Sequence, residues 1–116
     1  MIIVARLLRT IAFLGSTGRW PVVRGSLPRT IGNIEDAKQF IRASGSIGAN
    51  YIEANEAIGR KDFVMKIKIC RREAKETCYW LRLLDVDGNL ERQRQQLSAE
   101  AKELMNIFGA ILRKCE

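Results

Sequence analysis

Apolar residues return every seven residues along the stretch from Arg60 to Leu84. Their spacing alternates between four and three residues, which is the heptad pattern of one continuous helix face packed against other helices. The positions are Phe63, Ile67, Cys70, Ala74, Thr77, Leu81 and Leu84. A helix of this length is roughly 36 Å long at 1.5 Å per residue. The stretch therefore predicts a long helix that lies against other helices.

The same stretch carries cations on the face turned away from the apolar positions. With Ile67 at position a of the heptad, every b position is basic, and two arginines fill the turns between them. These residues, which we call the basic row, are Lys61, Lys68, Arg71, Arg72, Lys75 and Arg82. Lys and Arg bind a phosphate backbone without reading bases, so the basic row is a candidate nucleic-acid contact. A solvated outer face is the alternative, and the residues alone leave both open.

Two further segments repeat the heptad spacing. The first is expected to form a helix from an N-cap at Asn33 to about Gly59, with Ile34, Ala37, Ile41, Ser44, Gly48, Tyr51, Asn55 and Ile58 on its packing face. The second is expected from Leu90 to about Cys115, with Leu90, Arg94, Leu97, Ala101, Leu104, Phe108, Ile111 and Cys115. Turn residues 85–89, ending in a capping Asn89, separate it from the helix before it. Short connections between matched helices predict an antiparallel up-down bundle.

Three residues on the packing face of 33–59 are candidates for helix packing or subunit contact. Ser44 and Gly48 have almost no side chain, so a neighbouring helix is expected to approach closely there. Asn55 is either an exposed residue at the helix end or a buried amide that determines register or subunit pairing. Gly45 and Gly48 also match a G-x-x-G nucleic-acid clamp, but such a clamp needs flanking strands that this sequence lacks.

Residues 1–32 form an atypical N-terminal segment ahead of a helical core in residues 33–116. Ile3, Leu7, Ile11 and Leu14 have helical spacing, so residues 2–14 are expected to form a short helix that Gly15 ends. Residues 15–32 contain glycines and both prolines without an apolar period. The predicted fold is an all-α, antiparallel up-down four-helix bundle whose first helix is short or atypical.

The charge of the chain is local. The 116 residues carry a net charge of +7, and two segments hold the excess. Residues 1–32 contain five arginines and no acid, and residues 60–82 contain eight basic and three acidic residues. An anionic partner is therefore expected to meet the N-terminal segment or the third predicted helix.

Several kinds of chemistry lack the residues they need. There is no histidine, and the three cysteines, at positions 70, 78 and 115, include no C-x-x-C pair. No metal site, cofactor or enzymatic activity is therefore expected. Glu53 with Glu56 and Glu73 with Glu76 are paired carboxylates, expected to be solvated or salt-bridged, with Arg72 facing Glu76. The cysteine usage fits a reducing cytoplasm, and no apolar run is long enough to span a membrane.

Three stretches carry a family resemblance. They are residues 42–54 (RASGSIGANYIEA), 61–63 (KDF) and 76–84 (ETCYWLRLL). Together they resemble the bacterial four-helix bundle proteins first known from intervening sequences in large-subunit ribosomal RNA genes. They are also similar to the accessory variability determinant of diversity-generating retroelements. The resemblance covers residues 27–115.

The resemblance implies more than the residues do. It implies an antiparallel four-helix bundle that assembles into a ring, usually a pentamer, and no catalytic residues. For the retroelement relatives it implies sequence-nonspecific nucleic-acid binding by a basic surface, in partnership with a reverse transcriptase. We therefore expect a non-enzymatic homo-oligomer that binds RNA, DNA or an RNA-protein complex. A self-assembling adaptor that binds a protein partner without nucleic acid is the alternative.

Overall fold

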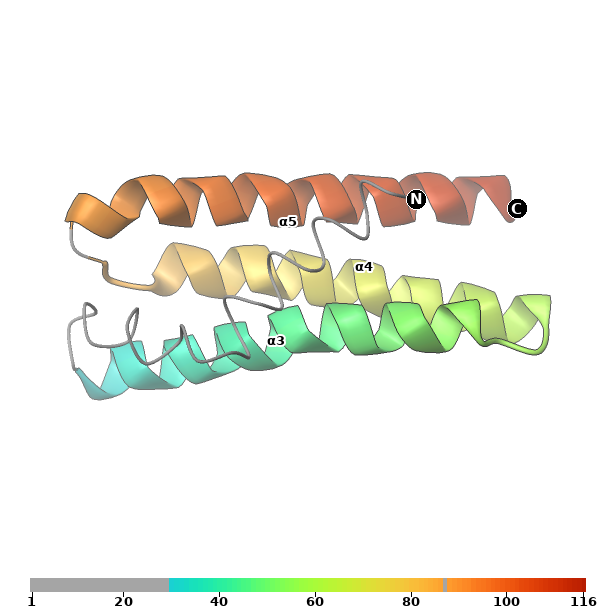
Figure 1. Cartoon of the computed structure of the whole chain (residues 1–116), viewed down its shortest axis with the longest axis horizontal. Coiled ribbons are helices and arrows are strands. Elements are labelled where there is room, and N and C mark those ends of the chain that lie inside the picture. Colours follow the sequence, from blue (N-terminus) through green and yellow to red (C-terminus); the bar gives the residue numbers. More distant parts are fainter. Residues whose placement is uncertain (1–29, 87) are drawn as a thin grey trace.

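The computed structural model describes residues 30–86 and 88–116, which form three α-helices and no strand. The helices are α3 (Ile31–Asn55), α4 (Arg60–Leu83) and α5 (Gly88–Lys114). They run antiparallel, with α4 lying between α3 and α5 (Figure 1). The all-α class is confirmed. The helix predicted in residues 2–14 lies outside the described residues, as does most of the predicted N-terminal segment 1–32.

Helix α3 begins earlier than predicted. Thr30 has an extended backbone, and its hydroxyl accepts a hydrogen bond from the Asn33 backbone N–H at 3.1 Å, so Thr30 is the N-cap. The prediction that Asn33 caps the helix is wrong. Its side chain instead donates to the carbonyl of Asp85 at 3.1 Å and accepts from the Asp85 N–H at 2.9 Å. Asn33 thereby ties the start of α3 to the α4–α5 loop.

The cap expected at the start of the last helix is also misplaced. Helix α5 already begins at Gly88, so Asn89 is its second residue. The boundaries of α4 agree with the sequence pattern. The turn before α4 has Gly59 in an extended conformation at the N-cap position, without a side-chain cap.

The packing face predicted for α4 is confirmed. Phe63 is partly buried, and the six positions that follow it are all buried. The buried positions are Ile67, Cys70, Ala74, Thr77, Leu81 and Leu84. The Thr77 hydroxyl donates to the Glu73 carbonyl one turn earlier at 2.8 Å, so its buried polar group is satisfied. The alternating four- and three-residue spacing was sufficient to predict the buried face of α4, because α4 has a helix on each side.

The packing face predicted for α3 is only half right. Ala37, Ser44 and Tyr51 are buried as expected. The other buried residues of α3, however, are Asn33, Phe40, Ala43, Ile47 and Ala54, in place of Ile34, Ile41, Gly48, Asn55 and Ile58. The buried face is therefore rotated by one residue toward α4. Helix α3 has apolar residues on two adjacent faces, and a heptad count cannot decide which of them meets α4.

Side chains of α3 and α5 contact each other in the core. Within the described residues the backbones of α3 and α5 stay apart, but the rings of Tyr51 and Phe108 lie 6.0 Å apart between centroids. They belong to the main core cluster, which also contains Ile47, Ala54, Ile67, Cys70, Ala74, Ala101 and Leu104. Phe108 is fully buried. It is the largest side chain by which α5 reaches the other two helices.

The three candidate packing residues of α3 have different surroundings. Ser44 is buried, and its hydroxyl donates to the Ile41 carbonyl at 3.1 Å. Apart from the adjacent residues and the backbone of α3 itself, no described atom lies within 4 Å of the place where a Cβ on Gly48 would stand. Asn55 is exposed at the last position of α3, which favours the helix-end alternative over a buried amide. The part of all three in assembly stays a prediction.

Replacing the two open glycines of α3 should stabilise the protein. Neither Gly45 nor Gly48 has a described neighbour within 4 Å of a built Cβ, and glycine inside a helix costs about 1 kcal/mol relative to alanine. The double variant Gly45→Ala/Gly48→Ala should therefore unfold at a higher denaturant concentration, with a gain of about 2 kcal/mol. A loss of stability in chemical denaturation would show that another helix packs closely against this edge.

Candidate nucleic-acid interface

The basic row lies on the outer face of α4. All six side chains are exposed. Lys61, Lys68, Lys75 and Arg82 follow one another at seven-residue intervals, so successive members are offset by about 10 Å along the axis and point in nearly the same direction. The structure thus brings the six predicted cations onto one helix face. Their contact with nucleic acid stays a prediction.

The buried carboxylate of α4 and its neighbour face α3. The Arg42 guanidinium of α3 donates to Glu76 at 2.7 Å and to Glu73 at 3.4 Å. Glu73 is only 5% exposed, and Arg72 lies 3.9 Å from its other carboxylate oxygen. The hydrogen bond to Glu76 raises the pKa of Arg42 above its usual value. Glu76 therefore pairs with Arg42 from another helix, and the predicted pairing with Arg72 is wrong.

A second ion pair connects the same two helices. The Lys66 ammonium lies 2.7 Å from a carboxylate oxygen of Glu53 on α3. That hydrogen bond raises the pKa of Lys66. Of the paired carboxylates Glu53 and Glu56, Glu53 is therefore salt-bridged to another helix, and Glu56 is exposed. Lys66 is not a member of the basic row, so this pair leaves the row unaffected.

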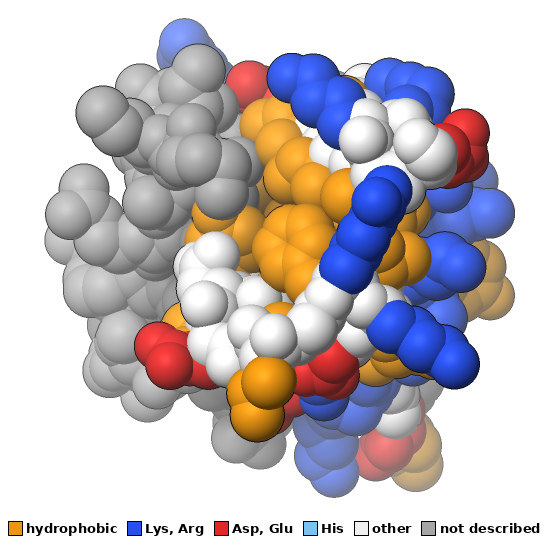
Figure 2. Space-filling model, turned by 90° about the vertical axis from the view of Figure 1, so that its right-hand side faces the viewer, with side chains coloured by type: hydrophobic (Ala, Val, Ile, Leu, Met, Phe, Trp, Pro, Cys, Tyr) orange, Lys and Arg blue, Asp and Glu red, His pale blue; other side chains and the backbone are white. Residues whose placement is uncertain are grey.

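Five members of the basic row have no carboxylate within 4 Å in the described part of the chain. They are Lys61, Lys68, Arg71, Lys75 and Arg82. Figure 2 views the end of the molecule where α3 leads into α4 and α5 finishes, and Lys and Arg side chains gather along its right-hand side beside an apolar centre. Like charges that lack counter-charges produce a positive potential that attracts anions.

Sequence reasoning assigned no cation of α5 to this surface. Arg113 nevertheless lies beside Arg71, because both guanidinium groups stand over Gly109 of α5. Arg113 is exposed near the end of α5, where a cation is also favoured by the helix dipole. The proximity of Arg113 to Arg71 results from the packing of α5 against α4, and the residue spacing within either helix does not indicate it.

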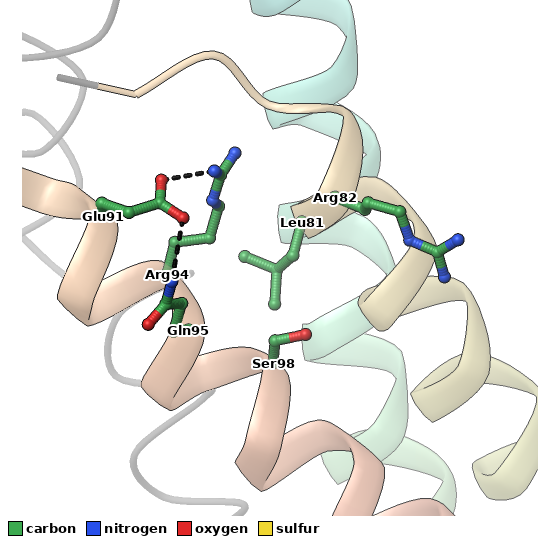
Figure 3. A pocket seen from close by; sticks show the side chains of 6 residues that line it. All are labelled: Leu81, Arg82, Glu91, Arg94, Gln95 and Ser98. Atoms are coloured by element: carbon green, nitrogen blue, oxygen red, sulfur yellow. Dashed lines mark hydrogen bonds and ion pairs between the residues drawn. The ribbon is translucent and has the colours of Figure 1, made fainter. Parts of the chain in front are cut away.

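A small pocket lies between the C-terminal part of α4 and the N-terminal part of α5. It has a volume of about 210 Å³ and is lined by Leu81, Arg82, Glu91, Arg94, Gln95 and Ser98 (Figure 3). Arg94 donates to Glu91 and to the backbone carbonyl of Leu84, and the hydrogen bond from Arg94 lowers the pKa of Glu91. Arg94 interrupts the apolar spacing of α5, and its hydrogen bond to the Leu84 carbonyl holds the C-terminal end of α4. Of the pocket's two arginines, Arg94 has a carboxylate partner, whereas Arg82 has none within the described ranges.

Two of the three cysteines, Cys70 and Cys78, are held as thiols by burial. Burial raises the pKa of the Cys70 thiol to about 12, and burial also raises the pKa of Cys78. A thiol becomes a nucleophile as the thiolate, so both are in the unreactive form near neutral pH. Among residues 30–86 and 88–116, no three Cys, Asp or Glu residues gather as ligands for a metal ion. No helix in the same ranges is long and apolar enough to cross a membrane.

These features define the class of the protein: an all-α protein of antiparallel helices with an outward cationic face on the middle helix. Residues 25–110 match the family model of the 23S rRNA-intervening sequence protein. Because this match covers most of the chain, the chain belongs to that family. No curated protein matches it.

A solved structure supports the family assignment. It is the crystal structure of a protein of unknown function from the S23 ribosomal protein family of Bacteroides thetaiotaomicron. The two sequences are 26% identical, and the alignment covers 96% of this chain and 92% of the other, with a TM-score of 0.59. The expected membership of the ribosomal RNA intervening-sequence proteins is therefore confirmed.

Proposed function

We propose that this protein is a non-enzymatic, homo-oligomeric helical bundle that binds nucleic acid through phosphate contacts from the basic row of α4. The observation that carries the proposal is the separation of charge on α4. Its inner carboxylates pair with Arg42 of α3, while five cations of the row face outward with no carboxylate partner in the described part of the chain. The ligand is RNA or an RNA-protein complex, in keeping with the family's ribosomal RNA context.

The side chains of the row suit phosphates better than bases. Lysine contributes a point charge and arginine a planar fork, and both bind a backbone regardless of sequence. Tyr79 is the half-exposed ring beside the row, and its edge-to-face partner Trp80 lies toward the apolar core. Binding to unpaired bases relies on a series of stacked rings. The proposal is therefore sequence-nonspecific binding to the phosphate backbone.

The assembly we propose follows the family resemblance. The bundle we propose is the four-helix bundle of this family, and the bundles assemble into a ring, usually a pentamer in this family. Support comes from apolar residues of α3 that the described residues leave partly uncovered: Ile52 is 65% exposed, and Ile34 and Ile41 are half-buried. A reverse transcriptase is the protein partner that the retroelement relatives imply. The cysteine usage supports a cytoplasmic location.

A second function is favoured by exposed apolar residues near the α3–α4 turn. Ile52, Ile58 and Met65 are 65%, 103% and 55% exposed. Apolar side chains that form a contiguous exposed patch mark protein interaction sites, and this alternative requires these three residues to belong to such a patch. On this alternative the protein is a self-assembling adaptor that binds a protein partner, and the cations of the basic row are solvated.

The salt dependence of binding separates the two functions. Each neutralised phosphate of a duplex contributes a slope of roughly −0.9 to log affinity against log salt, so five contacts should lower the affinity about 500-fold between 50 and 200 mM salt. Fluorescence anisotropy with a mixed-sequence RNA duplex measures this slope. Binding that is absent, or that changes by less than about fivefold over this range, would refute phosphate recognition by the row and favour the adaptor.

A further inference from the structure

We propose that α5 supplies part of the phosphate-binding surface, through Lys102 and Arg113. Nucleic acid would then lie along the groove where α4 meets α5, and the guanidinium groups of Arg71 and Arg113 would bind one phosphate between them. This inference rests on the proposed function, because it assigns further residues to the same surface. It concerns the α5 side of the basic row. The heptad pattern of α4 does not show which residues of α5 lie there.

Arg71 and Arg113 converge on one point although they come from different helices. A Cβ built on Gly109 would stand 3.5 Å from Nη1 of Arg113 and 3.8 Å from Nε of Arg71. Both side chains are exposed, and neither has a carboxylate within 4 Å in the described residues. Two guanidinium groups brought together in this way repel each other. A phosphate between them removes the repulsion and accepts charge-assisted hydrogen bonds from both forks.

A second pair of cations lies farther along the same groove. Arg82 lies one helical turn after Cys78 on α4, and Lys102 lies one turn after Ser98 on α5. Burial raises the pKa of the Cys78 thiol, and the positive charges of Lys102 and Arg82 oppose that rise. The Cys78 thiol in turn lies 3.9 Å from the Ser98 carbonyl of α5. Arg82 and Lys102 therefore stand on opposite sides of the α4–α5 contact, as Arg71 and Arg113 do.

The two pairs are in register along both helices. Arg71 and Arg82 are eleven residues apart on α4, and Lys102 and Arg113 are eleven residues apart on α5. Eleven residues make about three turns and span roughly 16 Å, so each pair of residues lies on one face of its helix. The groove thus has a cation on each side at both ends. That arrangement suits a polyanion lying along the groove better than a single small anion.

The opposite flank of α4 is unsuited to a polyanion. The cations that α3 carries are paired with acids: Lys38 lies 3.2 Å from Glu35, and Arg42 binds Glu73 and Glu76. Lys66 of α4 is paired with Glu53 on the same flank. An approaching phosphate would have to displace these carboxylates. On the α5 flank the acid of the pocket, Glu91, is already bound by Arg94.

The test is a matched pair of double charge reversals in the full chain. Lys102→Glu/Arg113→Glu should weaken binding of a mixed-sequence RNA duplex about 60-fold at 0.1 M salt and flatten the salt slope by about 2. Each new carboxylate would neutralise the cation opposite it, so the phosphates held by both pairs are lost. The control, Arg92→Glu/Lys114→Glu, changes two exposed cations of the same helix by the same amount. It should change the affinity less than about fivefold, because neither cation belongs to a pair across the α4–α5 contact and only the general effect of net charge remains.

The outcomes separate this inference from the proposed function. If the Lys102/Arg113 variant binds as the control does, while reversal of the α4 cations abolishes binding, the groove is refuted and the proposed function stands. If wild-type protein does not bind the duplex, both are refuted. A loss confined to the Lys102/Arg113 variant, with far-UV circular dichroism unchanged, supports the groove.

Discussion

Reversing three cations of α4 should weaken binding of duplex RNA by two to three orders of magnitude at 0.1 M salt. The variant is Lys68→Glu/Lys75→Glu/Arg82→Glu. Affinity varies roughly as the salt concentration to the power −0.9 per phosphate contact, so losing three contacts at 0.1 M costs about 500-fold. Repulsion by the three new carboxylates adds to this loss. The salt slope should become less steep by about 3, which anisotropy titrations at several salt concentrations measure.

The fold should survive this change. All three side chains are exposed, and none makes an ion pair within the described residues. Arg72 is left in place because it lies beside the buried carboxylate of Glu73, where a glutamate would bring two like charges together. The thermal midpoint should therefore stay within a few degrees of wild type.

A matched control removes the effect of net charge. Lys38→Glu/Arg92→Glu/Lys114→Glu also reverses three exposed cations, but none of them belongs to the basic row. The control should retain most of the affinity. Equal losses in both variants would mean that total charge, and not the face of α4, attracts the nucleic acid. Unchanged binding in the row variant would eliminate α4 as the contact surface.

Truncating Phe108 should have the largest effect on stability. Phe108→Ala removes a fully buried ring that contacts Tyr51 across the bundle. Phenylalanine-to-alanine changes in cores cost about 3–5 kcal/mol, as lost burial and a residual cavity add together. Domains of this size are stable by only about 5–15 kcal/mol. We expect the midpoint of thermal unfolding to fall by about 15 °C or more, as measured by circular dichroism.

The control for Phe108 keeps the site apolar. Phe108→Leu preserves most of the volume and should cost less than about 1.5 kcal/mol. A partly buried neighbour, Ile107, provides a second comparison, because its truncation should cost less than that of Phe108. If Phe108→Ala were as stable as Phe108→Leu, side-chain packing between α3 and α5 would not hold α5 in place.

How far the sequence predicts the site depends on whether one helix or two are needed to form it. The basic row is a property of α4 alone, so the positions of Lys68 and Lys75 on an exposed face followed from seven-residue spacing. The ion-pair partner of Glu76 did not follow from that spacing, because Arg42 reaches Glu76 from α3. The approach of Arg113 to Arg71 over Gly109 is also an interhelical fact. Its only sequence signal was a cation in the last turn of α5.

The fold shows the same division. Helix α4 has a helix on each side and a single apolar face, so only that face could be the buried one. Helix α3 has two adjacent apolar faces, so Phe40 and Ile47 were not distinguished from Ile41 and Gly48 until α4 was in place. Asn33 and Thr30 are both cap-forming residues, and the contact of Asn33 with the backbone of Asp85 decided between them.

The sequence by itself determined the helical class, the length and direction of the helices, and the exposed cations of α4. These follow from local periodicity, because a helix repeats its faces every 3.6 residues whatever surrounds it. Only the tertiary structure decided which face of α3 is buried, which acids are neutralised, and which cations of α5 stand beside α4. Those outcomes depend on the rotation of one helix against another, and side-chain packing selects that rotation.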